Sequence, residues 1–314
     1  MQTTITNSVK IAADFIKSGE VAAFPTETVY GIGANAYDEK AVRKIFKAKG
    51  RPADNPLIVH IARKKDILIL AKEITPSAKK IISVFFPGPV TVILKKNEIV
   101  PDIVTAGLNT IAIRMPASKI SRELIKQSGV PIAAPSANLS GSPSPTNFIH
   151  VLRDMRNKIP CVLVGPAARY GLESTVIDCT GKFPVILRPG SITLEQIRKL
   201  DKNAVYQKRV GKVKSPGQKY KHYAPKAKVK IITNYELRIT NKKSKTAFIG
   251  LNKKYAKGFE VVKICRSIED YAKNLFSFFR ECDEKGIKTI YCEKVSEKGI
   301  GAAIMNRLKK AIIN

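Results

Sequence analysis

The sequence predicts an α/β protein of two domains, in which a large twisted open sheet of mixed strand direction precedes a small parallel sheet of Rossmann-like type. The length of 314 residues exceeds the usual size of a single domain. Up to about residue 200, many short apolar runs stand close together with few long helical patterns between them, which disfavours strict βαβ alternation. Beyond residue 229, strand-like and helix-like segments alternate regularly, as is typical of a parallel sheet.

Helices of the first region are predicted where apolar residues recur at helical spacing between capping and breaking residues. Asn7 can cap the first helix and Gly19 can end it, Gly50 and Pro87 end two others, and Thr193 can cap the last. Short apolar runs bounded by turn residues predict strands. The predicted helices cover 7–18, 41–49, 74–86, 118–129 and 194–200, and the predicted strands cover 21–24, 56–61, 89–96, 110–115, 131–134, 161–165, 174–179 and 184–188.

A basic segment separates the two regions. Residues 202–230 contain ten Lys or Arg and no acid, and their Pro, Gly, Lys and Tyr show no apolar periodicity, so a linker is predicted. We therefore place the first domain at 1–201, the linker at 202–228 and the Rossmann-like domain at 229–314. Within the last of these, strands are predicted at 229–233, 246–251, 261–265 and 289–293, and amphipathic helices at 271–286 and 301–313.

The composition favours an anionic partner and a reducing compartment. The 56 Lys and Arg against 25 Asp and Glu give a net charge of +31, which suits RNA but also fits a lysine-rich genome. The five cysteines are odd in number and form no CxxC, so neither a disulfide framework nor a clustered zinc site is indicated. With no signal peptide and no apolar run of about 18 residues, we expect a cytoplasmic protein.

Two cations stand in a proline-rich loop just before a predicted strand. In KGRPADNP (49–56), Lys49 is a point charge and Arg51 a bidentate donor, and together they suit a polyphosphate. A solvated basic turn is the competing interpretation. His60 lies inside the strand that follows, where a histidine is more often a hydrogen-bonded core residue than a ligand contact.

Other segments offer groups for a polar ligand. Arg114 ends an apolar strand and needs a carboxylate if it is buried, which either a ligand or a protein Asp or Glu can supply. Hydroxyls gather in FPTETVYGIGANA (24–36), APSANLSGSPSPT (134–146) and GLESTVIDCTG (171–181), although each could be an ordinary turn. Patterns of Walker, zinc-protease, EF-hand and α/β-hydrolase sites are absent, so any ATP site is not a Walker site.

Taken in order along the chain, these segments resemble the YrdC family of threonylcarbamoyl-AMP synthases. The resemblance covers about residues 8–200. The segment SPGQKYKHYAPKA (215–227) with its Rossmann-like tail is similar to the long two-domain form of the family. The matching motifs are PTETVYGIGANA, KGRPADNPLIVHI, FPGPVTVIL, IAIRMP, APSANLSG, GLESTVID and ILRPG.

The resemblance implies a YrdC-like twisted sheet with a large concave, positively charged cavity, and a nucleotidyltransferase activity. Family members form threonylcarbamoyl-AMP and pyrophosphate from L-threonine, bicarbonate and ATP, and Mg²⁺ is expected with the ATP. A separate transferase would then pass the threonylcarbamoyl group to an adenosine beside the anticodon of tRNA.

The resemblance also assigns site residues by matching motif positions. Lys49 and Arg51 would act in catalysis by stabilising charge on the phosphates. Residues 202–230 would form a lid over the cavity as well as a tether, because carbamates decompose readily in water. L-threonine would be bound by Thr28, His60, Arg114, Ala134 and Ser174, and ATP by Lys49, Arg51, Asn55, Thr110, Ser136, Asn138, Ser144, Arg188 and Tyr223.

Two other functions compete with this interpretation. The net charge also suits a non-catalytic module that binds double-stranded or ribosomal RNA, which would bind in a salt-dependent way without using ATP. A carbamoyl transferase of the hydrogenase-maturation type contains a YrdC-like domain too, but such chains are much longer and carry zinc-finger cysteines. The lack of CxxC here argues against that type.

Overall fold

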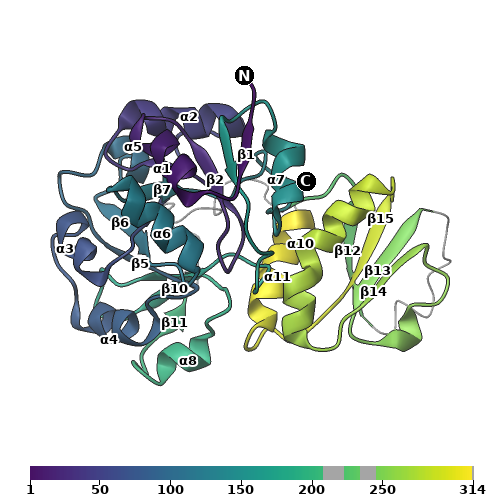
Figure 1. Cartoon of the computed structure of the whole chain (residues 1–314). Helices are drawn as coiled ribbons and strands as arrows, with labels where there is room; N and C mark the ends of the chain where they lie inside the picture. Colours follow the sequence, from purple (N-terminus) through teal and green to yellow (C-terminus); the bar gives the residue numbers. More distant parts are fainter. Residues whose placement is uncertain (208–222, 234–244, 313–314) are drawn as a thin grey trace.

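The computed structural model describes residues 1–207, 223–233 and 245–312, which form two sheets (Figure 1). Most of the predicted linker and lid, residues 208–222, lies outside the described residues. The domain boundaries at 201 and 228 stay predictions, although the last strand of the first sheet extends to residue 206. None of the described helices is long and apolar enough to cross a membrane.

The first sheet confirms the predicted mixed, open architecture. Among the described residues its order is β1-β8-β2-β3-β7-β4-β6-β5-β9-β10-β11. Parallel pairs such as β4 with β6 occur beside antiparallel pairs such as β4 with β7. The strands are β1 (Thr4–Thr6), β2 (Ala22–Phe24), β3 (Gly31–Asn35), β4 (Ile58–His60), β5 (Val90–Lys95), β6 (Thr110–Arg114), β7 (Ile132–Ala134), β8 (Cys161–Leu163), β9 (Thr175–Asp178), β10 (Val185–Arg188) and β11 (Val205–Tyr206).

Helix α2 begins and ends at residues that capping favours. Asp38 accepts hydrogen bonds from the first amides of α2, and Gly50, with φ of 58°, ends that helix. Lys49 therefore occupies the last turn of α2, directly before the basic loop. The helices are α1 (Val9–Lys17), α2 (Glu39–Lys49), η1 (Lys64–Asp66), α3 (Ile67–Leu70), α4 (Pro76–Phe85), α5 (Asp102–Thr105), α6 (Lys119–Ser128), α7 (Phe148–Met155) and α8 (Leu194–Arg198).

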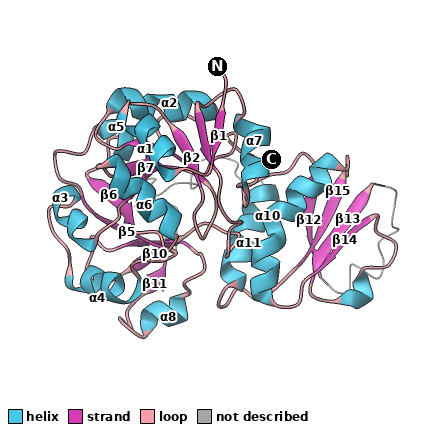
Figure 2. Ribbon diagram, in the orientation of Figure 1, coloured by secondary structure: helices cyan, strands magenta, loops and turns pink. Residues whose placement is uncertain are grey.

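The second domain contains the predicted small parallel sheet. Its described strands follow the order β12-β15-β13-β14, and every pair is parallel. Helices α10 and α11 lie between this sheet and the first domain, as Figure 2 shows. The elements are β12 (Lys228–Ile232), β13 (Thr246–Gly250), η2 (Lys253–Tyr255), β14 (Val261–Ile264), α10 (Ile268–Glu284), β15 (Thr289–Glu293) and α11 (Gly301–Ile312).

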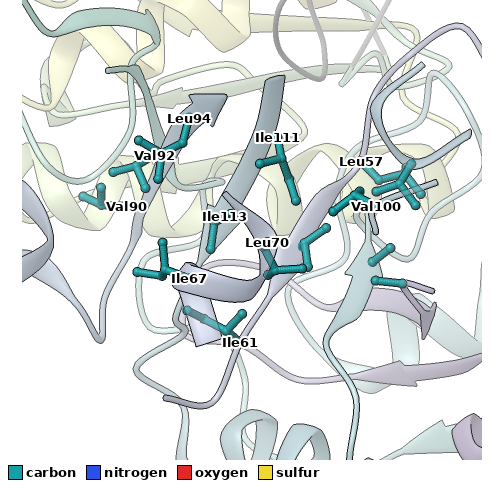
Figure 3. Packing of buried hydrophobic residues seen from close by; sticks show 14 of the residues in the cluster. Leu57, Ile61, Ile67, Leu70, Val90, Val92, Leu94, Val100, Ile111 and Ile113 are labelled. Atoms are coloured by element: carbon teal, nitrogen blue, oxygen red, sulfur yellow. The ribbon is translucent and has the colours of Figure 1, made fainter. Parts of the chain in front are cut away.

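Strand alternation gives the first sheet one core face and one face for a site. Leu57, Val59 and Ile61 along β4 belong to the main apolar cluster, part of which is shown in Figure 3. Ile58 and His60 therefore project from the opposite face. The same alternation in β6 buries Ile111 and Ile113 in the cluster and leaves Arg114 on the face of His60, with which it is in register.

Several elements of the first domain differ from the sequence prediction, which did not contain the short elements β1, η1, α3, α5 and β11. Residues 31–35 form strand β3 where a ligand-presenting loop was expected, because β2 and β7 pair with it on both sides. A Cβ on Gly33 would stand 2.3 Å from a side-chain carbon of Ile132, so the close approach of these strands requires glycine. Helix α7 was not predicted, although Asn147 caps it by accepting from the His150 amide.

Candidate active site

A cavity of about 60 Å³ opens on the site face of the first sheet. Strand ends and loops from seven separate parts of the first domain line it, together with Tyr223. Its polar groups fall into two sets, which we call the arginine–histidine group (Thr28, His60 and Arg114) and the cationic group (Lys49, Arg51 and Arg188).

Arg114 is held at the cavity wall by a protein carboxylate. Its guanidinium donates to Glu27 Oε1 at 2.6 Å and to Thr28 Oγ1 at 2.8 Å. Burial alone would raise the pKa of Glu27, but the charge of Arg114 outweighs it and holds that pKa below its usual value. The sequence left open whether a ligand or the protein would supply a carboxylate for Arg114, and Glu27 of the protein supplies one. Within the described residues, Arg114 Nε stays buried without a hydrogen-bond partner.

His60 presents a neutral imidazole to the cavity. Burial, with the neighbouring charge of Arg114, lowers its pKa from 6.5 to about 3. Its Nδ1 lies 3.1 Å from the Ile58 carbonyl oxygen, which can only accept, so Nδ1 carries the proton. The other ring nitrogen is then an acceptor for a donor on a ligand.

Lys49 ties the basic loop to the hydroxyl-rich loop. Its ammonium donates to the carbonyl oxygens of Ser136 and Asn138, both at 2.5 Å, and its own carbonyl accepts from the Ser140 amide. Only 2 % of Lys49 is exposed, and burial followed by the charge of Arg51 lowers the pKa of its ammonium well below the ordinary value. One of the three ammonium protons remains for a ligand.

Arg51 has donors that the protein leaves unused. Its Nη2 donates to the carbonyls of Asn55 and Pro56 at 3.2 and 3.3 Å. Within the described part of the chain, Arg51 Nε and Asn55 Oδ1 are buried without a hydrogen-bond partner. Burial lowers the pKa of Arg51 to about 10, so it stays charged at neutral pH. Unmatched polar atoms beside a cavity are typical of a site that a ligand or water completes.

Arg188 is fixed by the strand that faces it. Its Nε and Nη2 donate to the carbonyl and hydroxyl oxygens of Ser174, each at 3.2 Å, and Thr91 Oγ1 lies 2.8 Å from the same hydroxyl. A Cβ on Gly190 would stand 2.3 Å from the Thr175 amide nitrogen. The close approach that brings Arg188 to Ser174 therefore depends on glycine at position 190.

Glu173 lies among these cations, already paired. It accepts from Ser144 Oγ and from Arg307 Nε, the latter at 2.8 Å. Burial would raise the pKa of Glu173, but Arg307 and Arg188 together hold it below its usual value. Because Arg307 balances Glu173, the cationic group keeps its positive charge. The arginine–histidine group, in contrast, is close to neutral because Glu27 balances Arg114.

Tyr223 is buried at the mouth of the cavity. Its ring stacks on Phe276 of α10 with centroids 5.3 Å apart, and Arg307 lies over the ring at 5.3 Å. The next residue, Ala224, donates its amide to the Gly141 carbonyl at 2.9 Å. Tyr223 thus connects the second domain to the hydroxyl-rich loop.

Two family models match the chain almost end to end. Residues 14–190 match the Sua5/YciO/YrdC model, described as "Telomere recombination", and residues 192–312 match "Threonylcarbamoyl-AMP synthase, C-terminal domain". The chain belongs to the Sua5/YciO/YrdC family. Both predicted regions are therefore covered by family models, and the predicted resemblance is confirmed.

Individual members of the family are similar over the whole length. The threonylcarbamoyl-AMP synthase of Pyrococcus abyssi is 48% identical, over 96% of this chain and 93% of that protein. The Bacillus subtilis enzyme of the same name is 43% identical, over 98% and 94%. The crystal structure of P. abyssi Sua5 complexed with L-threonine superposes with a TM-score of 0.91 at 45% identity, covering 99% of this chain and 98% of that one.

Most residues predicted for the site of this Sua5/YciO/YrdC protein meet at one cavity. Three do not line it. Asn55 lies behind Arg51, Ser144 is buried against Glu173, and Thr110 lines a separate surface depression with Lys95 and Lys96. Thr110 and Arg114 occupy opposite ends of β6, and the assignment of Thr110 to ATP stays a prediction. The residues that line the cavity are Thr28, Lys49, Arg51, His60, Arg114, Ala134, Ser136, Asn138, Ser174, Arg188 and Tyr223.

The sequence analysis missed three charged residues. Glu27 and Glu173 stand inside motifs that were quoted for their hydroxyls, and their pairing with Arg114 and Arg307 depends on folding. Arg307 did carry a signal, because it falls on the apolar stripe of the predicted helix 301–313, with Ile304 and Leu308.

A dedicated metal site does not fit the residues present. No group of three or more His, Cys, Asp or Glu side chains able to hold a metal occurs among the described residues. Glu173 is the carboxylate in the cavity lining, and it is engaged by Arg307 and Ser144. The predicted Mg²⁺ stays a prediction, and it would arrive on the phosphates of ATP.

Proposed function

We propose that this chain is an L-threonylcarbamoyladenylate synthase. It takes L-threonine, bicarbonate and ATP, and it releases threonylcarbamoyl-AMP and pyrophosphate. A tRNA threonylcarbamoyl transferase then uses the product to modify the adenosine next to the anticodon. The proposal rests on the names of relatives that are similar over the whole chain and on the L-threonine complex of P. abyssi Sua5.

One observation carries the proposal: a single cavity joins a nearly neutral polar group to a strongly cationic one. The cationic group has three positive side chains and suits a triphosphate. The arginine–histidine group offers the Arg114 Nε–H, which has no partner in the described part of the chain, with the Thr28 hydroxyl and an acceptor nitrogen on His60. Those groups suit the carboxylate, hydroxyl and amine of an amino acid.

The amino acid would react first. The amine of threonine attacks the carbon of bicarbonate, water leaves, and N-carboxy-threonine forms. The proton that the neutral amine loses leaves with the bicarbonate hydroxyl as water, so no base has to keep it. His60, neutral with a pKa of about 3, orients the amine as a hydrogen-bond acceptor. Arg114, already balanced by Glu27, fixes the amino acid by directed hydrogen bonds more than by net charge.

The new carboxylate would then attack the α-phosphate of ATP, and the bond to pyrophosphate breaks. Negative charge grows on the phosphate oxygens during this step, and preorganised cations stabilise it. Arg51, with an unused buried Nε, and Arg188 and Lys49 supply that stabilisation. No side-chain nucleophile is required, since the substrates provide both reacting groups.

The size of the cavity bears on how substrates enter. A volume of about 60 Å³ holds roughly two water molecules, whereas sites for small molecules measure about 300–1,000 Å³. We therefore expect a wall segment to move when ATP binds. Tyr223 is a wall residue held by contacts with the second domain, so its displacement would enlarge the cavity. The predicted lid role of 202–230 stays a prediction.

Pyrophosphate release from ATP tests the proposed reaction. We expect release that requires L-threonine and bicarbonate together, and little release with alanine, valine or serine. Release that ignores threonine or bicarbonate would refute the reaction. RNA binding by the folded protein with no nucleotide use would instead favour the RNA-binding module, whose support remains the net charge of +31.

A further inference from the structure

Arg307 belongs to the second domain but is buried against the first. Its side chain is fully buried, with 0 % exposed, and it is the largest fully buried side chain among the described residues. It projects from α11, the helix that lies between the small sheet and the first domain (Figure 1). A buried guanidinium is retained only when acceptors satisfy it, so its partners indicate its role.

Apart from Asn306 on its own helix, which accepts from Nη1 at 2.9 Å, the partners of Arg307 lie in three segments of the active site. Nε donates to Glu173 Oε2 and Nη1 donates to the Pro189 carbonyl, both at 2.8 Å. Nη2 lies 3.5 Å from the Glu173 carbonyl, and the guanidinium covers the Tyr223 ring. The planar fork of arginine is suited to acceptors in several directions at once.

Two of these segments carry a group assigned above to ATP, Arg188 and Tyr223, and the third carries Ser174, which is assigned to L-threonine but accepts hydrogen bonds from Arg188. Glu173 precedes Ser174, which accepts from Arg188, and it also accepts from Ser144. Pro189 directly follows Arg188. Tyr223 itself lines the cavity, whereas Arg307 does not. Arg307 can therefore affect a ligand through the positions and charges of these neighbours and not by direct contact.

The interface around Arg307 is closely packed. A Cβ on Gly171, whose φ is +71°, would stand 2.2 Å from the Lys273 carbonyl of α10, so the backbones meet closely. Val29 and Leu172 of the first domain pack within the apolar cluster of the second domain. Buried Arg280 of α10 donates to the Pro143 carbonyl at 2.5 Å and so holds the hydroxyl-rich loop as well.

We propose that Arg307 is a positioning residue through which the second domain shapes the nucleotide side of the active site. This inference deepens the proposed function and rests on the assignment of the cationic group to ATP. It makes the second domain part of the site's architecture, although none of its residues from 245 to 312 lines the cavity.

The test is the affinity of the full-length protein for ATP, measured by calorimetry, with the KM values for ATP and threonine measured beside it. Arg307→Met removes the fork, and Arg307→Lys keeps the charge but cannot reach the same acceptors. We expect both variants to raise the Kd and KM for ATP at least tenfold and to change the KM for threonine less than twofold. If Arg307→Met does not fold, Arg307→Lys decides.

Two matched controls separate positioning from general damage to the interface or helix. Arg153→Ala removes an exposed ion pair with Glu284 of α10, at the interface between the domains. Lys309→Ala removes an exposed ion pair with Glu297, and Lys309 lies on the same helix as Arg307. Both should leave the Kd for ATP within twofold.

Folded Arg307 variants with wild-type Kd for ATP would overturn the inference, as would an equal loss of threonine affinity. Wild-type protein that binds ATP but releases no pyrophosphate would refute the reaction and leave the inference to be decided by the Kd values. Wild-type protein that binds no ATP would overturn both.

Discussion

The buried pair of Glu27 and Arg114 makes a sharp prediction about stability. Its atoms are 2.6 Å apart, and only 7% and 5% of the two side chains are exposed. Glu27→Gln leaves the guanidinium buried without its counter-charge, which typically costs about 3–5 kcal/mol. We expect a loss of that size in the free energy of unfolding, measured by urea titration at pH 7 with circular dichroism.

An exposed pair of the same kind provides the control. Lys44 and Glu20 are 2.5 Å apart, but their side chains are 41% and 37% exposed. Solvent screening reduces such pairs to about 0–1 kcal/mol, so Glu20→Gln should change stability by less than 1 kcal/mol. The double variant Glu27→Gln/Arg114→Met should lose less than the sum of its single changes, because no charge is then left unpaired.

A loss below 1 kcal/mol for Glu27→Gln, equal to that of the control, would refute the reasoning. It would mean that water reaches Arg114 and that the guanidinium does not depend on Glu27. Additivity in the double variant would carry the same meaning. The account of the arginine–histidine group as nearly neutral would then be wrong.

Three further predictions concern the cavity. Gly190→Ala places a Cβ 2.3 Å from the Thr175 amide nitrogen, so it should destabilise the protein by about 1–3 kcal/mol and raise the KM for ATP. The control Gly181→Ala, whose Cβ would have no atom within 4 Å, should change neither quantity. His60 has a pKa of about 3 in the folded protein and 6.5 in the unfolded chain, so the unfolded state binds more protons between these values and the free energy of unfolding falls as the pH falls. Replacing His60 with Gln should reduce this fall between pH 6.5 and pH 5 by about 1.5 kcal/mol. An unchanged pH dependence would contradict the burial of His60 as a neutral group. Arg51→Ala should chiefly raise the KM for ATP and His60→Ala chiefly that for threonine, and equal effects of both on ATP alone would contradict the division of the cavity.

Much of the fold could be predicted because local patterns agreed with the tertiary structure. The helix ending at Gly50 and the strand holding His60 were both found, since a left-handed end and an apolar run are local signals. Strand β3 was missed because Gly31 and Gly33 weaken a strand locally, and its formation depends on β2 and β7. That information lies in distant parts of the chain.

The candidate site was predicted by type better than by pairing. Motif positions indicated the cations Lys49, Arg51 and Arg188, and the structure brings them to one cavity. Sequence could not tell whether a ligand or a protein group balances Arg114, because Glu27 reaches it only across the folded sheet. It likewise gave no reason to connect Arg307 with Glu173, which are 134 residues apart.

The most direct test of the central claim is the product itself. The full-length protein is incubated with ATP, L-threonine and ¹³C-bicarbonate, and the nucleotides are separated at once and examined by mass spectrometry. We predict an adduct of AMP that contains threonine and one labelled carbon, and that forms in smaller amount at limiting ATP when Arg51 is changed to Ala. An adenylate of threonine without the labelled carbon, or no adduct from protein that binds both substrates, would contradict the account.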